Sequence, residues 1–175
     1  MRIRGWFLGL VAVGTGLPTS CARKPAAVEL GHGLAAEERG KVEEEVRSFL
    51  ARVAQEVTRE GPTAWKREFA AGQEFFMASD GKLAFEDGRA AAEGMDAVAK
   101  AIKRIELRWG KDLKVDVLTP ELAVVGTSWQ ERQETDQGQV VNESVYFTGV
   151  TEKQEGRWVF RDAHWSVAPP VASGL

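Results

Sequence analysis

The fold is decided by the last long stretch of the chain, RWVFRDAHWSVAPP at residues 157–170, which follows the polar run EKQEG at residues 152–156. Aromatic and β-branched residues alternate with polar ones after a glycine, a pattern typical of a strand entered through a hairpin turn. Proline lacks the amide hydrogen that a strand ladder needs, so Pro169 and Pro170 end the strand. The pattern therefore predicts a long final β-strand.

The first half of the chain has helical periodicity instead. Apolar residues recur at intervals of three and four over residues 42–57 with charged residues between them, which predicts one long amphipathic helix beginning at Glu37. The Gly-Pro pair at residues 61–62 ends this helix and starts a short second one. Trp65 and Phe69 share one face of the second helix.

Shorter elements follow. An Asp-Gly turn within residues 79–82 separates two short apolar runs and predicts a small hairpin. A third helix is expected around Met95, Val98, Ile102 and Ile105. The remainder reads as four long strands, at residues 106–118, 122–134, 141–152 and 157–167. Helices first and a sequential antiparallel sheet last predict an α+β fold in one domain, residues 37–170, with a short tail at residues 171–175.

The N-terminus has the pattern of an export signal over residues 1–21. A basic start precedes an apolar run that is too short to span a bilayer stably. The residues before Cys21 resemble the lipobox of bacterial lipoproteins, in which the cysteine becomes a lipid anchor. The lipobox has leucine three residues before the cysteine, whereas here Pro18 stands there and Leu17 is the fourth residue before it. The alternative is a secreted protein cut near Ala22.

Residues 22–36 lack apolar periodicity and have the composition of a tether. Both interpretations of the N-terminus predict a domain outside the cytoplasm, either lipid-anchored in the cell envelope or secreted or periplasmic. Cys21 is the only cysteine, so we expect no intramolecular disulfide.

Charge argues against a nucleic-acid partner. The formal net charge is −3 and charges of both signs are interspersed, whereas nucleic-acid surfaces gather basic residues on one face. No spacing of His or Cys resembles a zinc site, and His32 lies in the tether. We therefore expect neither a metal nor a cofactor.

The order of elements and the final strand resemble the nuclear-transport-factor-two-like, or SnoaL-like, superfamily. The resemblance covers residues 37–170 and implies a cone, with N-terminal helices packed in a strongly curved, mostly antiparallel sheet. Its closing motif is similar to that of the calcium/calmodulin-dependent kinase II association domain. That similarity rests on Glu93-Gly94-Met95-Asp96, on residues 118–125, and on Gly156-Arg157-Trp158 followed by His164 and Ser166.

The resemblance also implies which residues line the cone. It places Trp165 at a cavity position that is commonly arginine in the association domain, and Trp129 and Gly149 at other such positions. Strand alternation adds Arg161 to the face of Trp165 as the remaining positive charge. Aromatic walls suit a small-molecule pocket. Further wall candidates are Trp65, Phe69, Phe76, Phe85, Trp109 and Phe147; the alternative for each ring is ordinary core packing.

The sequence offers two catalytic candidates, His164 and Asp162. His164 and Asp162 share a strand face and form an imaginable acid–base pair, but alternation places them opposite Trp165, where a structural hydrogen bond is the commoner role. Tyr146, the only tyrosine, is expected outside the cone, which disfavours chemistry of the steroid-isomerase kind that the resemblance would allow.

Three functional hypotheses remain open at this point. The preferred one is a binding module that holds a small apolar or amphipathic ligand between Trp129 and Trp165, with Arg161 meeting a carboxylate or other polar end of the ligand. The second is a SnoaL-like enzyme of the isomerase, cyclase or hydrolase type, which a cavity carboxylate with a raised pKa would favour. The third, compatible with both, is an oligomer such as a homodimer, formed through an outer apolar patch of Trp158, Phe160 and Tyr146.

Overall fold

An amphipathic helix packed against a curved sheet organises the chain, and the computed structural model describes residues 33–167. The helices are α1 (Ala36–Glu60), the 3₁₀ helix η1 (Pro62–Arg67) and α2 (Gly88–Ala101). The apolar stripe expected for the first helix is buried in α1. The export signal, Cys21 and the C-terminal prolines lie outside the described residues. No helix within residues 33–167 is both long and apolar enough to cross a membrane.

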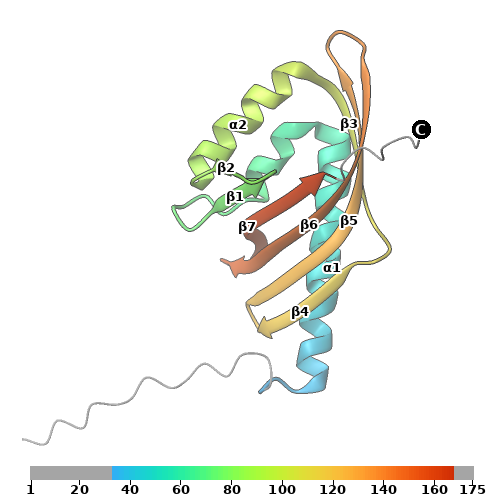
Figure 1. Ribbon diagram of the computed structural model, residues 1–175. Coiled ribbons are helices and arrows are strands. Elements are labelled where there is room, and N and C mark those ends of the chain that lie inside the picture. The colour runs from blue at the N-terminus through green and yellow to red at the C-terminus, as the bar shows by residue number, and fades with distance from the viewer. Residues whose placement is uncertain (1–32, 168–175) are drawn as a thin grey trace, which may run out of the picture.

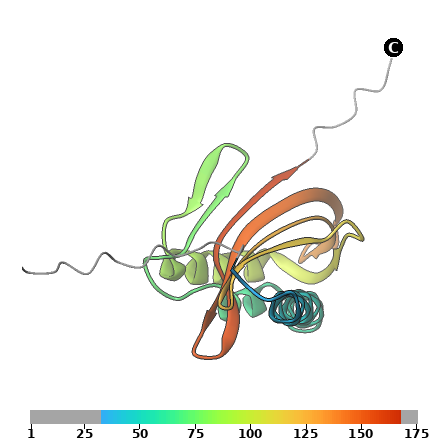
Figure 2. The ribbon, with the colours of Figure 1, turned by 90° about the horizontal axis from the view of Figure 1, so that it is seen from below.

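The seven strands within residues 33–167 form one sheet. They are β1 (Phe76–Ser79), β2 (Lys82–Phe85), β3 (Ile102–Trp109), β4 (Lys114–Thr119), β5 (Leu122–Thr135), β6 (Val140–Gln154) and β7 (Arg157–Val167). Their order is β2-β1-β7-β6-β5-β3, with β4 also pairing to β5. All pairs are antiparallel except β1 with β7. Figure 1 shows α1 running along the sheet, and Figure 2 shows the sheet as a curved layer with α1 and α2 on one side. We call that side the helix-covered face and the other the outer face.

The third helix is shorter than its apolar spacing predicts. It ends at Ala101, and Ile102 and Ile105 belong to β3. The Ile105 side chain is buried in the sheet, so the same apolar residues satisfy a strand as well as a helical period. The helical prediction for these two residues was wrong because tertiary packing decided between the two periods.

The strand expected at residues 106–118 is two strands. The chain turns at Gly110, whose amide donates to the carbonyl of Ser128 at 2.6 Å. Asp112 then accepts hydrogen bonds from the Thr127 hydroxyl and from the amide and hydroxyl of Ser128. A Cβ on Gly110 would lie 2.0 Å from the Ser128 hydroxyl oxygen. The turn therefore needs glycine, and β3 and β4 pair with different halves of β5.

A β-bulge interrupts the alternation of β7. Val150 pairs with Asp162 and Thr151 with Phe160, so Arg161 is an extra residue without an opposite partner. A bulge shifts every later side chain to the other face. Phe160 and Trp165 therefore both face the helices, although strict alternation puts them on opposite faces.

The bulge also removes most of the outer patch expected from the sequence. Phe160 is fully buried, with ring centroids 4.9 Å from Phe49 and 5.2 Å from Phe147. Trp158 is buried as well, and its indole nitrogen donates to Glu45 of α1. Of the three expected patch residues, Tyr146 alone is exposed, at 45%.

Candidate functional site

A pocket of about 160 Å³ opens between α2, η1 and the helix-covered face of the sheet. Strands β3, β5, β6 and β7 supply one wall, and the helices supply the other. Its lining is apolar except at one end, where β5 and β6 carry polar side chains. The lining residues are Pro62, Trp65, Phe69, Met95, Val98, Ile105, Trp129, Glu131, Gln133, Glu143, Val145, Phe147, Ala163 and Trp165.

Aromatic rings from four elements form the apolar wall. The rings of Trp129 and Phe147 stack with centroids 5.6 Å apart, and Trp165 lies 5.7 Å from Trp129. Trp65 stacks on Phe69 at 5.5 Å. The strand register brings the sheet residues together. Phe147 pairs directly with Trp165, and its partner on β5, Thr127, lies two residues before Trp129 and so on the same face. Such rings offer large apolar area with a defined geometry.

The indole nitrogen of Trp129 is an unusual feature of this wall. It is buried and has no hydrogen-bond partner among residues 33–167. Buried polar groups are normally paired. By contrast, the indole nitrogen of Trp109, on the neighbouring strand, donates to the carbonyl of Leu50 at 2.7 Å. Trp129 therefore carries a donor, in a pocket-lining side chain, that an acceptor atom on a ligand would satisfy.

The polar end of the pocket is built around Glu131, which is only 8% exposed. The side-chain amide of Gln133 donates a hydrogen bond to its Oε1. Glu143 is its direct partner across β5 and β6. Burial raises the pKa of the Glu131 carboxyl above its ordinary value, the Gln133 hydrogen bond opposes this rise, and the negative charge of Glu143 adds to it. The pocket thus holds a carboxyl group that keeps its proton more readily than a solvated one.

Five of the residues expected to line the cavity lie together in this pocket: Trp65, Phe69, Trp129, Phe147 and Trp165. Trp109 lies behind them, with its ring 5.4 Å from Trp129 and 5.5 Å from Phe147. Gly149 does not line the pocket; a Cβ there would come within 2.9 Å of the Phe147 ring and 3.0 Å of the Asp162 carbonyl oxygen. Its role in the structure is to leave room for that ring.

Three expected cavity residues lie elsewhere. Phe76 is 48% exposed, and Phe85 packs against Gly94 of α2, because the β1–β2 hairpin lies at the far end of the sheet order from β3. Arg161 does not line the pocket; its guanidinium pairs with Glu152 at 3.3 Å. The bulge at Arg161 accounts for this third error, since strict alternation had grouped Arg161 with Trp165.

The two catalytic candidates are not in the pocket. His164 is exposed, and Asp162 accepts a hydrogen bond from the amide of Val150 at 3.3 Å. Burial raises the pKa of Asp162, and the Val150 hydrogen bond and the charge of Arg161 oppose the rise. Both side chains lie on the outer face of β7. Residues 33–167 contain no group of three or more His, Cys, Asp or Glu arranged to hold a metal ion.

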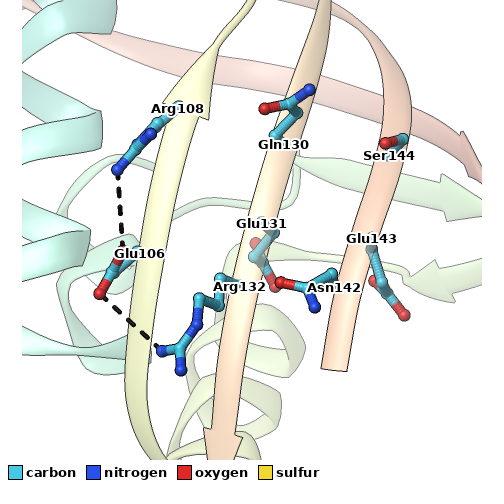
Figure 3. Close-up of a pocket in the computed structure, with 8 residues that line it drawn as sticks. All are labelled: Glu106, Arg108, Gln130, Glu131, Arg132, Asn142, Glu143 and Ser144. Carbon is cyan, nitrogen blue, oxygen red and sulfur yellow. Dashed lines mark ion pairs between the residues drawn. The ribbon is translucent and has the colours of Figure 1, made fainter. Parts of the chain in front are cut away.

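A second depression, of about 350 Å³, lies on the outer face over β3, β5 and β6 (Figure 3). Two of its lining residues, Glu131 and Glu143, also line the aromatic pocket. Among the others, Glu106 lies 3.9 Å from Arg108 and 3.9 Å from Arg132. Glu106 also pairs with Arg104 at 3.1 Å. Because the ion pairs are satisfied and apolar walls are lacking, this depression offers less to a ligand than the aromatic pocket.

Sequence reasoning left the polar end of the pocket unassigned. Its side chains, Glu131, Gln133 and Glu143, are absent from the cavity residues predicted from the sequence. The signal was present in β5, because Trp129, Glu131 and Gln133 alternate along one strand and share a face. Assigning Trp129 to the cavity therefore implied the other two.

Comparisons with known proteins give a fold and no closer relationship. No family model matches the chain, and no curated protein matches it. A nuclear transport factor 2-like protein from Salmonella enterica superposes with a TM-score of 0.65 at 18% identity, covering 78% of this chain and 99% of that one. A proposed calcium/calmodulin-dependent protein kinase II association domain from Xanthomonas campestris superposes with a TM-score of 0.60 at 15% identity, covering 73% of this chain and 88% of that one.

An enzyme is also among the similar structures. The LinA type 3 hexachlorocyclohexane dehydrochlorinase of Novosphingobium barchaimii superposes with a TM-score of 0.61 at 10% identity, covering 80% of this chain and 97% of the enzyme. Identities this low show a shared architecture alone. The expected α+β cone is confirmed: the chain has the nuclear transport factor 2-like fold.

Proposed function

We propose that this protein binds a small, mainly apolar molecule in the pocket between α2 and the sheet. The observation that carries the proposal is the enclosure of one buried carboxyl group, Glu131, by a wall of aromatic rings. Apolar pockets with few convergent polar groups are the usual form of small-molecule sites. The rings would supply most of the contact area, and the polar end would fix the orientation of the ligand.

The size of the pocket narrows the choice of ligand. Its volume of about 160 Å³ is below the roughly 300–1,000 Å³ typical of sites for drug-sized molecules. A molecule with one ring or a short chain fits better than a steroid or a long fatty acid. The polar groups available to it are Glu131, Gln133 and Glu143 at the polar end, and the unpartnered indole nitrogen of Trp129.

A second candidate function is proton transfer by Glu131. Burial and the charge of Glu143 raise the pKa of Glu131, which brings a carboxyl group closer to the range where it serves as a general acid or base near neutral pH. In this role the carboxylate would take a proton from the bound molecule and the carboxyl would return it. The fold also occurs in a dehydrochlorinase, although that likeness concerns architecture alone.

Tryptophan fluorescence tests the binding proposal. Titration with 2-phenylethanol should change the emission of the wild-type chain, because four indoles cluster at the pocket, and Trp165→Ala should abolish the saturable change. Trp158→Phe is the matched control, since Trp158 packs against α1 through Glu45 and does not line the pocket. Absence of a saturable response to this alcohol and to the related amine and acid would overturn the proposal, and an equal response in Trp165→Ala would exclude this pocket.

We also propose that the domain acts outside the cytoplasm, held by a lipid anchor at Cys21. The basic and apolar N-terminus and the lipobox-like residues before the cysteine support this proposal. Labelled palmitate should enter the wild-type protein in a bacterial host and be absent from Cys21→Ser. Incorporation that persists in the variant, or soluble release of both forms in equal amounts, would contradict the anchor.

A further inference from the structure

Every charged side chain that lines the pocket is acidic. Glu131 and Glu143 face each other across β5 and β6. None of the lining residues, all of which lie within residues 33–167, is Lys, Arg or His. Arg161, which the sequence predicted to meet a carboxylate or other polar end of the ligand, instead pairs with Glu152 away from the pocket. The electrostatics of the site are therefore opposite to those that would hold a carboxylate ligand.

The aromatic walls of the pocket also favour a positively charged ligand. Ring faces carry negative electrostatic potential and attract cations, most strongly when the ring belongs to tryptophan. Three of the lining rings are the indoles of Trp65, Trp129 and Trp165. An aromatic enclosure with carboxylates at one end is the arrangement that recognises an organic ammonium group.

On this basis we infer that the molecule bound in the pocket is an organic cation: a small amine with an apolar body, whose ammonium group lies at Glu131 and Glu143. This inference rests on the proposed binding function and specifies its ligand class. The apolar body would lie among Trp65, Phe69 and Phe147. The buried indole nitrogen of Trp129 would serve an acceptor atom on the same molecule.

The protonation state of Glu131 couples amine binding to the release of a proton. Glu143 is the titratable group that faces Glu131 from β6; the lining residues from β3, η1, α2 and β7 are uncharged. An ammonium group beside Glu131 favours its ionised form and offsets the repulsion from Glu143. Where Glu131 is protonated in the free protein, binding of an amine releases that proton to the solvent, whereas binding of a neutral alcohol does not.

Three probes of matched shape and different charge test the inference: 2-phenylethylamine, 2-phenylethanol and 3-phenylpropionate. Each is titrated into the full chain by calorimetry in two buffers of different ionisation enthalpy. We expect the amine to bind about tenfold more tightly than the alcohol, with the acid weakest, as for a partly desolvated cation in an aromatic site. The amine should also show buffer-dependent heat from proton release.

Glutamate variants test whether the carboxylates, and not the aromatic walls, select the amine. Glu131→Gln should reduce the preference for amine over alcohol to less than about threefold, and Glu143→Gln should reduce it by a smaller factor. Glu106→Gln, on the outer face with Arg104, should leave it unchanged. Glu143→Gln keeps the test valid should Glu131→Gln fail to fold.

Failure of the inferred ligand class can be distinguished from failure of the proposed binding function. Equal or tighter binding of the alcohol or the acid, lost in Trp165→Ala, would overturn the cationic ligand and leave the binding function standing. Saturable binding of none of the three probes would overturn both. A preference for the amine that survives both glutamate substitutions would also overturn the inference, because the charge would then be read elsewhere.

Discussion

The side-chain amide of Gln133 donates a hydrogen bond to the carboxyl of Glu131, two residues earlier on β5, and both side chains face the aromatic pocket. A donor at this position stabilises the ionised form of a buried acid. Gln133 therefore opposes the burial that raises the pKa of Glu131. The protonation state of the only strongly buried acid in the pocket depends on this neighbour.

Replacing Gln133 by leucine should raise the pKa of Glu131 further, because the charged form loses its hydrogen-bond donor while burial remains. Carboxyl-carbon NMR titration measures this directly, with the Glu131 signal assigned by its disappearance in Glu131→Gln. Gln130→Leu, on the outer face of the same strand, is the control and should leave the titration unchanged. A fall in the Glu131 pKa in Gln133→Leu would contradict the assigned role.

Glu131→Gln should increase stability selectively at higher pH. The folded-state pKa of Glu131 is raised, so the unfolded chain releases this proton first as pH increases. The contribution of Glu131 to folding stability is fully present below the ordinary glutamate pKa. It is lost as the pH rises through the folded-state pKa. The amide cannot ionise and escapes that loss.

Urea unfolding at about pH 4 and about pH 8 measures the difference. We expect Glu131→Gln to gain stability relative to wild type on going from the lower to the higher pH. Glu121→Gln, exposed at the turn between β4 and β5, should show a smaller change. A gain for Glu131→Gln at low pH only would reverse the expected sign and contradict the raised pKa.

The sequence predicted the architecture because its determinants are local. The apolar stripe of α1, the proline at residue 62 and the turn at residue 156 each specify an element without knowledge of the rest of the chain. The face of Arg161 was not predictable in this way, since the bulge depends on the pairing of Val150 and Thr151 across the sheet. Alternation is reliable only between such irregularities.

The candidate site was predicted on its aromatic side and missed on its polar side. Trp129 and Trp165 followed from the resemblance to a known fold. Glu131 required a further step along β5, because glutamate in a strand is normally solvated. The prediction that Phe85 lines the pocket was wrong for a different reason, because its ring packs against Gly94 of α2. The composition of a hairpin does not reveal which apolar surface the hairpin covers.

The indole nitrogens of Trp109 and Trp129 should differ in their contribution to stability. Trp109 donates to the Leu50 carbonyl at 2.7 Å, whereas the Trp129 nitrogen has no partner among residues 33–167. Replacing each with 3-benzothienylalanine keeps the ring shape and removes the donor. We expect a loss of about 1 kcal/mol at position 109 and no loss, or a small gain, at position 129.

Chemical denaturation compares the two substituted proteins with wild type. Each analogue serves as the control for the other, because ring size and sulfur content are identical. Equal losses at both positions would show that the indole nitrogen of Trp129 has a partner in solution, which would remove the polar contact proposed between this nitrogen and the ligand.

Two helical glycines should respond in opposite directions to alanine. Gly40 is exposed on α1 and a Cβ there would meet nothing within 4 Å. A Cβ on Gly94 of α2 would lie 2.3 Å from Cε1 of Phe85. Gly40→Ala should stabilise the protein by about 0.5–1 kcal/mol through helix propensity. Gly94→Ala should destabilise it by about 1–3 kcal/mol, because the Phe85 ring must move.

The cause of the Gly94 effect can be isolated with a double-mutant cycle. Phe85→Leu shortens the side chain that Gly94 accommodates, so Gly94→Ala should cost less in that background than in wild type. Thermal unfolding of the four proteins gives the coupling, with Gly40→Ala as a matched glycine-to-alanine change without a neighbour. Additive effects would mean that Phe85 does not pack on α2 in solution, and Phe85 would then again be a candidate for the pocket wall.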